Sequence, residues 1–168
     1  SRAFRRPATP AEIDRYAKLV EQTTAAGKKW EEGLQLAMQA VLISPKFLFR
    51  LELDDSPSAK GVRSLDEFQL ASRLSYFLWA SMPDDELFQL ASKGELSKNI
   101  DAQIRRMLRD PKAKTLVENF ALQWLQIGRI KQFQADPQLF PQFDEPLKMA
   151  MLQETELLLK DWCRREGY

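Results

Sequence analysis

The spacing of apolar and polar residues along the chain predicts helices. In several runs the apolar residues recur every three or four positions, which places them on one face of an α-helix. The most apolar run is Ser64–Ala80, whose second half, LSYFLWA, is apolar nearly all round. A helix of that kind is buried, so we expect the other helices to pack around it. Six further runs have helical spacing: Thr9–Gly27, Lys29–Ile43, Ser81–Gly94, Ser97–Arg109, Asp110–Leu125 and Asp144–Arg165.

These runs predict an all-α fold, an irregular helical bundle of about seven helices with no sheet. The clearest linker is DDSPSAKGVR, residues 54–63, which combines Asp, Ser, Pro and Gly without apolar periodicity. We therefore expect an N-terminal helical module over residues 1–53 and a C-terminal helical module over residues 64–168. Phe47–Leu51 follow the proline that ends the second helix, and they form either a further helical turn or an extended piece.

Composition narrows the chemistry that the chain can perform. Apolar residues make up 44% of the 168 residues and charged residues 29%, as in ordinary folded proteins, and the net charge is only +1. The chain has no histidine, which excludes Ser-His-Asp and Cys-His catalysis and the histidine-containing zinc and haem sites. Its lone cysteine, Cys163, cannot form an internal disulfide. We expect no cofactor in this chain.

Two basic clusters invite a binding function. The N-terminal lead carries Arg2, Arg5 and Arg6 and is either an anion-binding arm or, as we favour, a solvated tail that Phe4 anchors to the core. The second cluster lies within Arg105–Lys114, where no exposed aromatic residues interleave with the charges. A nucleic-acid site needs stacking aromatics or a suitably placed helix, so we expect no nucleic-acid partner.

An acidic row, Asp84, Asp85 and Glu86, lies at the start of a predicted helix. Three adjacent carboxylates suggest a metal site, but a calcium loop needs more oxygen ligands and a glycine at its turn. Acidic residues in a first turn also offset the helix dipole. We favour this capping role and expect no metal.

The longest irregular stretch is Gly128–Phe143, which carries Phe133, Phe140 and Phe143. Loops of this length are uncommon unless they pack on their own side chains or serve a function such as binding. We favour a packed loop and keep a partner-binding loop as the alternative.

Two charged residues lie among apolar positions of predicted helices. Arg73 is inside the central run, and Glu154 lies in the middle of the apolar arc of the last helix. Because a buried charge without a partner is costly, we hypothesise a structural ion pair between Arg73 and Glu154, with Glu118 as the alternative acid. A catalytic or metal-binding carboxylate would need a second carboxylate or a histidine nearby, and the Glu-x-x-His motif of di-iron proteins is missing from the sequence. The apolar arc of the last helix, in which Glu154 lies, comprises Leu147, Ala150, Met151, Leu157, Leu158 and Trp162.

Two long stretches carry a family resemblance. The first contains RAFRRPATPAEIDRY and GLQLAMQAVLISPKFLFRLE, and the second contains LDEFQLASRLSYFLWASMPDDELFQLA, VENFALQWLQIGRI and LFPQFDEPLKMAMLQETELL. They resemble two adjacent uncharacterised helical domains of large planctomycete-type exported proteins that also carry a cytochrome-c-like domain. The resemblance implies an extracytoplasmic location and a link to redox chemistry or polymer breakdown. It supplies no catalytic residues that could be assigned to positions of this sequence.

Two features depart from the pattern of that family. The sequence has no haem-attachment motif, so haem chemistry would belong to another domain. The sequence also ends at Tyr168, where the family's second domain continues, so we expect the C-terminal module to be truncated.

We therefore expect a non-catalytic helical scaffold or interaction module within a larger exported multidomain protein. Its partners would be the other domains of the same protein; we expect no membrane insertion, and the oligomeric state is left open. The alternative is part of an extracytoplasmic enzyme whose active site needs missing domains, with Asp84, Asp85 or Glu154 as the candidate carboxylates. Convergent carboxylates in a pocket would favour the enzyme, whereas an exposed apolar patch around Phe133–Phe143 would favour the module.

Overall fold

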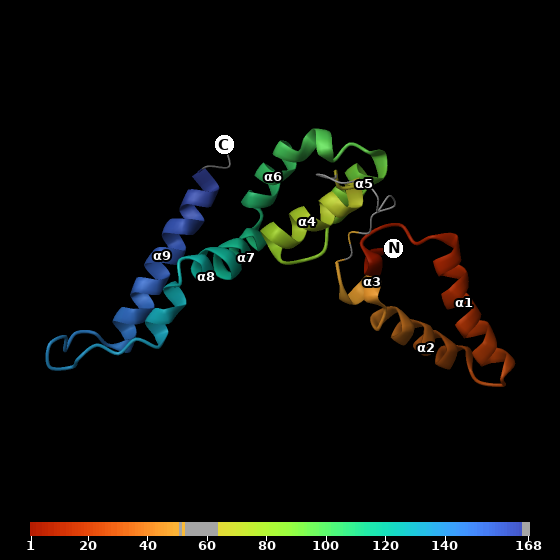
Figure 1. Cartoon of the computed structure of the whole chain (residues 1–168), viewed down its shortest axis with the longest axis horizontal. Helices are drawn as coiled ribbons and strands as arrows, with labels where there is room; N and C mark the ends of the chain where they lie inside the picture. The colour runs from red at the N-terminus through yellow and green to blue at the C-terminus, as the bar shows by residue number, and fades with distance from the viewer. Residues whose placement is uncertain (51, 53–63, 166–168) are drawn as a thin grey trace, which may run out of the picture. The chain divides into compact units, whose positions relative to one another are not determined.

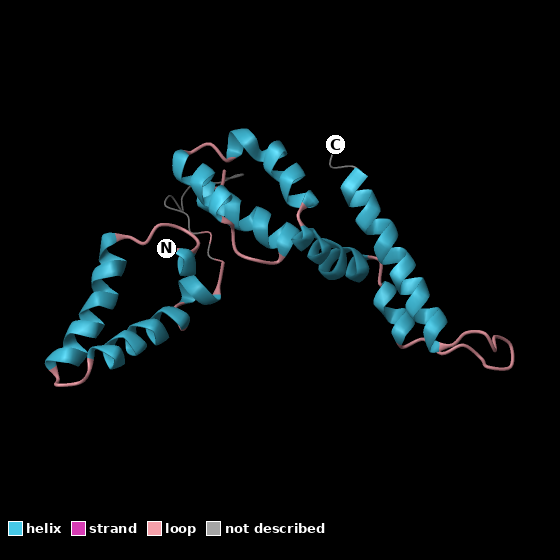
Figure 2. Ribbon diagram, turned by 180° about the vertical axis from the view of Figure 1, so that it is seen from behind, coloured by secondary structure: helices cyan, strands magenta, loops and turns pink. Residues whose placement is uncertain are grey.

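The computed structural model describes residues 1–50, 52 and 64–165, and every regular element in them is helical (Figures 1 and 2). The all-α prediction is confirmed for this part of the chain, which contains no strand. The helices are α1 (Pro10–Ala25), α2 (Trp30–Leu42), α3 (Pro45–Leu48), α4 (Glu67–Trp79), α5 (Asp85–Lys93), α6 (Ile100–Arg109), α7 (Lys114–Leu116), α8 (Leu122–Trp124) and α9 (Glu145–Arg165).

The helix count is close to the prediction. A π-helical turn, Val117–Ala121, joins α7 to α8, so these three segments form one continuous helix. Counted in this way, the described residues contain eight helices, one more than the seven predicted. The additional helix is α3, because the segment after the second helix forms a helical turn rather than an extended piece. The predicted linker at 54–63 lies outside the described residues.

The chain divides into two compact units, Ser1–Ser72 and Arg73–Tyr168, and the division falls inside α4. Burial of α4 is less complete than its apolar sequence predicts. Its buried residues are Ala71, Ser75, Leu78 and Trp79, but Phe77 is 57% exposed. The expectation that this helix is buried all round is therefore wrong on the side that carries Phe77.

The first unit is built on a hairpin of α1 and α2 (Figure 1). Thr9 and Glu12 form a capping box, and Pro10 occupies the first helical position, where its missing N–H costs nothing. Gly33 lies so close to α1 that an added Cβ would be 3.0 Å from the Cα of Val20. The absence of a side chain at Gly33 is therefore what allows the two helices to approach each other.

The second unit has a small, well-buried core. Leu87, Leu96, Met107 and Val117 are essentially inaccessible to solvent. Leu87 and Met107 come from α5 and α6, Leu96 from the turn between these two helices, and Val117 from the π-helical turn after α7. Gly94 ends α5 with φ +69°, a left-handed conformation that glycine adopts without strain. The long helix α9 packs along the π-helical turn and the 3₁₀ turn Ile127–Lys131. In the described part of the chain no helix is both long enough and apolar enough to cross a membrane.

Candidate functional site

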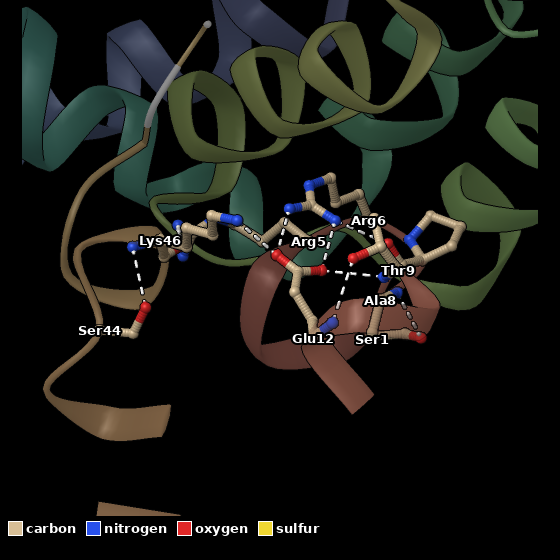
Figure 3. A network of polar contacts seen from close by, with 9 residues as sticks. Ser1, Arg5, Arg6, Ala8, Thr9, Glu12, Ser44 and Lys46 are labelled. Atoms are coloured by element: carbon tan, nitrogen blue, oxygen red, sulfur yellow. Dashed lines mark hydrogen bonds and ion pairs between the residues drawn. The ribbon is translucent and has the colours of Figure 1, made fainter. Parts of the chain in front are cut away.

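A polar network in the first unit is centred on Glu12 (Figure 3). The Glu12 side chain is only 12% exposed. Its carboxylate accepts hydrogen bonds from the guanidinium of Arg6 at 2.7 and 3.0 Å, from the ammonium of Lys46 at 2.5 Å and from the backbone N–H of Thr9 at 2.8 Å. The hydrogen bonds from Arg6 are the main reason why the pKa of Glu12 lies well below its ordinary range, and Lys46 adds to the effect. Glu12 therefore stays ionised and ties the N-terminal lead to α1 and α3.

Arg5 fastens the same lead to α3. Its backbone is left-handed, with φ 56°, and its buried guanidinium donates to the carbonyl oxygens of Lys46, Phe47 and Phe49 at 2.8 to 3.3 Å. These carbonyls lie at the end of α3, where a helix has no internal donors left. Phe4 is also buried and packs against Tyr16, with ring centroids 6.2 Å apart.

The prediction that the N-terminal lead is a solvated tail is therefore wrong, although the prediction that Phe4 anchors it is correct. The guanidinium groups of Arg5 and Arg6 bind acceptors within their own unit, so these two side chains do not form an anion-binding arm either.

A second polar network in the other unit connects α5 to α6. Asp84 caps α5 by accepting from the backbone N–H of Leu87 at 3.0 Å, and it also accepts two bonds from Arg106 at 2.6 and 3.2 Å. Partial burial raises the pKa of Asp84, but the hydrogen bonds from Arg106 and Leu87 outweigh that effect and hold the pKa below its ordinary value. The indole N–H of the buried Trp79 donates to the carbonyl of Met107 at 2.9 Å.

The basic cluster within Arg105–Lys114 and the acidic row at Asp84–Glu86 both contribute residues to this second network. The Arg106 guanidinium and the Lys112 ammonium lie 5.5 and 4.7 Å from the centroid of the Trp79 ring, within the range of cation–π attraction. The predicted capping role is confirmed for Asp84, with Asp85 and Glu86 in the first turn of α5. Among the described residues, no group of three or more potential metal ligands comes together.

Both members of the hypothesised ion pair have exposed side chains. Arg73 and Glu154 each lie in contact with solvent, so neither charge has to be offset inside a core. The premise that Glu154 lies on a buried arc is wrong, because α9 packs through a different face, the one that carries Lys148 and Leu152. The pair between Arg73 and Glu154 stays a hypothesis without that premise.

The phenylalanine-rich loop is held by one aromatic pair and still exposes two of its phenylalanine side chains. Phe133 and Phe143 meet edge to face with centroids 5.6 Å apart, and the ammonium of Lys148 lies 5.7 Å from the Phe143 ring. Phe133 and Phe140 nevertheless remain more than half exposed. The loop therefore closes on itself through one aromatic pair while presenting apolar side chains to solvent.

Exposed apolar helix faces are candidate surfaces for binding a partner. Trp30, Leu34, Met38 and Leu42 follow one another at intervals of four residues along α2, and each is between 38% and 58% exposed. Gly33 and Ala37, which are buried in the hairpin, each precede a member of this row by one position, so they lie on the adjacent flank of α2. We call the first four residues the α2 stripe.

The second unit presents a row of three aromatic rings. Phe77 of α4 meets Phe120 edge to face at 5.9 Å, and Phe120 stacks on Trp124 at 6.2 Å with the rings 9° from parallel. All three residues are at least half exposed. Phe120 lies in the π-helical turn, which shifts the register of the side chains that follow it. No pattern in the sequence distinguishes this turn from an ordinary α-helix, so the row could not be predicted.

The comparisons with known proteins identify families of unknown function. The model of the PSD4 family, described as a protein of unknown function (DUF1592), matches residues 65–168. The model of the PSD5 family, described as a protein of unknown function (DUF1595), matches residues 1–52. The predicted resemblance to two adjacent uncharacterised domains is thereby confirmed. No curated protein and no solved structure matched the chain.

Proposed function

We propose a non-catalytic interaction role for this chain, which belongs to the PSD4 family of proteins of unknown function. The chain would serve as a helical scaffold that positions neighbouring domains of a larger exported protein, and any redox chemistry would reside in those domains. The α2 stripe is the observation that carries this proposal.

The α2 stripe is unusual because four large apolar side chains in one row each stay between 38% and 58% exposed. Scattered apolar residues are normal on protein surfaces, but four large ones in a continuous row mark an interaction surface. Trp30 and Met38 are also residue types enriched where proteins meet. A helix groove or sheet face of a neighbouring domain could bury this row in the manner of helix-in-groove recognition.

The charged residues of the chain support a structural role. Glu12 and Asp84 have lowered pKa values and therefore remain ionised near neutral pH, a state unsuited to a general acid. Glu12 completes a capping box and Asp84 caps a helix. Each carboxylate also forms a salt bridge with an arginine side chain of its own unit. Both features favour a scaffold whose polar groups maintain the fold.

The proposal is tested by measuring binding between this chain and its neighbouring domains, produced separately, by isothermal titration calorimetry. Replacing Met38 by lysine should weaken binding at least tenfold, because a charge would be placed in the centre of an apolar contact. Ile13→Lys is the matched control, since Ile13 is 57% exposed in the same unit but lies outside the α2 stripe. Equal loss in both variants, or no binding by the unmodified chain, would refute the proposal.

A further inference from the structure

The last helix carries an exposed apolar stripe of its own. Leu147, Met151, Leu158 and Trp162 lie on one face of α9, and each is between 38% and 67% exposed. The buried residues Lys148 and Leu152 each follow a member of this row by one position, so they lie on the adjacent flank of the helix. The four exposed residues, called here the α9 stripe, are therefore not the face through which α9 packs in its own unit.

The spacing of the α9 stripe is the same in both directions along the helix. Successive members are 4, 7 and 4 residues apart, so the row is symmetric about the bond between Glu154 and Thr155. If a second α9 lies antiparallel with its midpoint at the same place, Leu147 lies opposite Trp162 and Met151 lies opposite Leu158. A surface that matches itself in this way suits a two-fold symmetric contact between identical chains.

Charges at the two ends of α9 obey the same symmetry. Asp144, which caps the helix, and Arg165, in its last turn, lie at equal distances from the midpoint. In the antiparallel arrangement Asp144 of each copy lies opposite Arg165 of the other, so opposite charges meet at both ends. Arg165 already pairs with Asp161 at 2.8 Å, but its guanidinium has five N–H donors and can bind a second carboxylate.

The area of the α9 stripe suits a weak dimer. Counting about 150–250 Å² for each of the four large side chains, their exposed fractions give roughly 300–500 Å² on each copy. A pair of stripes would bury about 600–1,000 Å², which reaches the lower limit for a specific interface only at the top of that range. We expect a dissociation constant in the micromolar range, from about 1 to 100 μM.

We propose that the α9 stripe binds the α9 stripe of a second copy of this chain, antiparallel and with the two-fold axis at Glu154 and Thr155. This inference concerns self-association and does not depend on the proposed role toward neighbouring domains. A two-fold axis brings each flank of the helix to the same flank of the other copy, so the two Glu154 carboxylates lie near each other and weaken the contact.

Sedimentation equilibrium of the whole chain between about 1 and 200 μM tests the proposal, since this range brackets the expected constant. The unmodified chain should pass from monomer to dimer. Leu158→Lys should weaken association at least tenfold, because the substitution occurs twice in each dimer. Met149→Lys is the control: Met149 is 56% exposed on the same helix but faces away from the stripe. Unchanged helicity by circular dichroism confirms that both variants are folded.

Two further variants test the predicted geometry. Glu154→Gln removes the central repulsion and should tighten the dimer about two- to fivefold. In a Cys163→Ser background, Thr155→Cys should form a disulfide between copies, whereas Met151→Cys should not, because antiparallel copies hold those positions about 10 Å apart along the helix axis.

Any of four results would overturn the proposal. A monomer at every concentration would exclude the contact, and equal weakening by Leu158→Lys and Met149→Lys would exclude the α9 stripe as its site. Cross-linking through Met151→Cys as efficient as through Thr155→Cys would show parallel helices. Binding to anionic phospholipid vesicles without self-association would assign the stripe to a membrane surface instead.

Discussion

Substitution of Glu12 by glutamine tests whether the N-terminal lead is held by a charged network. The change keeps the size of the side chain and removes its charge. Glu12 accepts charge-assisted hydrogen bonds from Arg6 and Lys46, and such bonds contribute about 1.5–3 kcal/mol when buried. The side chains of Arg6 and Lys46 are 35% and 42% exposed, so solvent screening reduces each contribution. We expect the free energy of unfolding to fall by about 2–3 kcal/mol at pH 7.

Urea titration followed by circular dichroism measures this loss. Glu32→Gln is a matched control, because Glu32 occupies the same third position in the capping box of α2 and is exposed. Its substitution should cost about 0.5 kcal/mol or less, as expected for an exposed capping residue. If Glu12→Gln costs no more than Glu32→Gln, the network does not hold the lead in place.

The effect of Glu12 depends on pH in a defined direction. The pKa of Glu12 is lowered in the folded chain from an ordinary value near 4.5, so ionised Glu12 stabilises the fold fully above that pH. This contribution is lost progressively as the pH falls below 4.5 toward the folded pKa. The difference in stability between the unmodified chain and Glu12→Gln should therefore be smaller at pH 3 than at pH 7. A difference that grows on acidification would contradict this assignment.

Two further predictions concern packing. Gly33→Ala should lower the free energy of unfolding by about 1 kcal/mol or more in a urea titration, because the new Cβ would lie 3.0 Å from the backbone of Val20. Gly128→Ala, where a Cβ meets nothing within 4 Å, should be neutral or slightly stabilising, and equal effects of the two changes would contradict the close approach of α1 and α2. Trp79→Phe should cost about 1–2 kcal/mol by the same measurement, because it leaves the carbonyl of Met107 without its indole donor, and an unchanged urea midpoint would contradict this role.

Local features of the fold could be predicted from the sequence because they depend on a few adjacent residues. The capping box of Thr9 and Glu12, the Asp84 cap of α5 and the glycine that ends α5 all follow from residue types at fixed positions. Gly33 lies inside an apolar helix face, where a glycine indicates a close approach, and α1 does approach α2 closely there.

Features that depend on which surfaces meet could not be predicted in the same way. Periodicity places Leu147, Met151, Leu158 and Trp162 on one face of α9 but does not show whether that face is covered. The chain instead buries the flank with Leu152, leaving the more apolar face and Glu154 exposed. The role of Arg5 was missed for a similar reason, because its acceptors lie more than forty residues away along the chain.

The central claim is that the α2 stripe is a contact surface for neighbouring domains of a larger protein. Hydroxyl-radical footprinting measures it directly, because tryptophan and methionine are readily oxidised when exposed. Trp30 and Met38 of the α2 stripe should be strongly labelled in this chain alone and protected in the larger protein that contains its neighbouring domains. Met149, which lies outside both proposed contact surfaces, should be labelled equally in the two. Equal labelling of Trp30 and Met38 in both proteins would contradict the account.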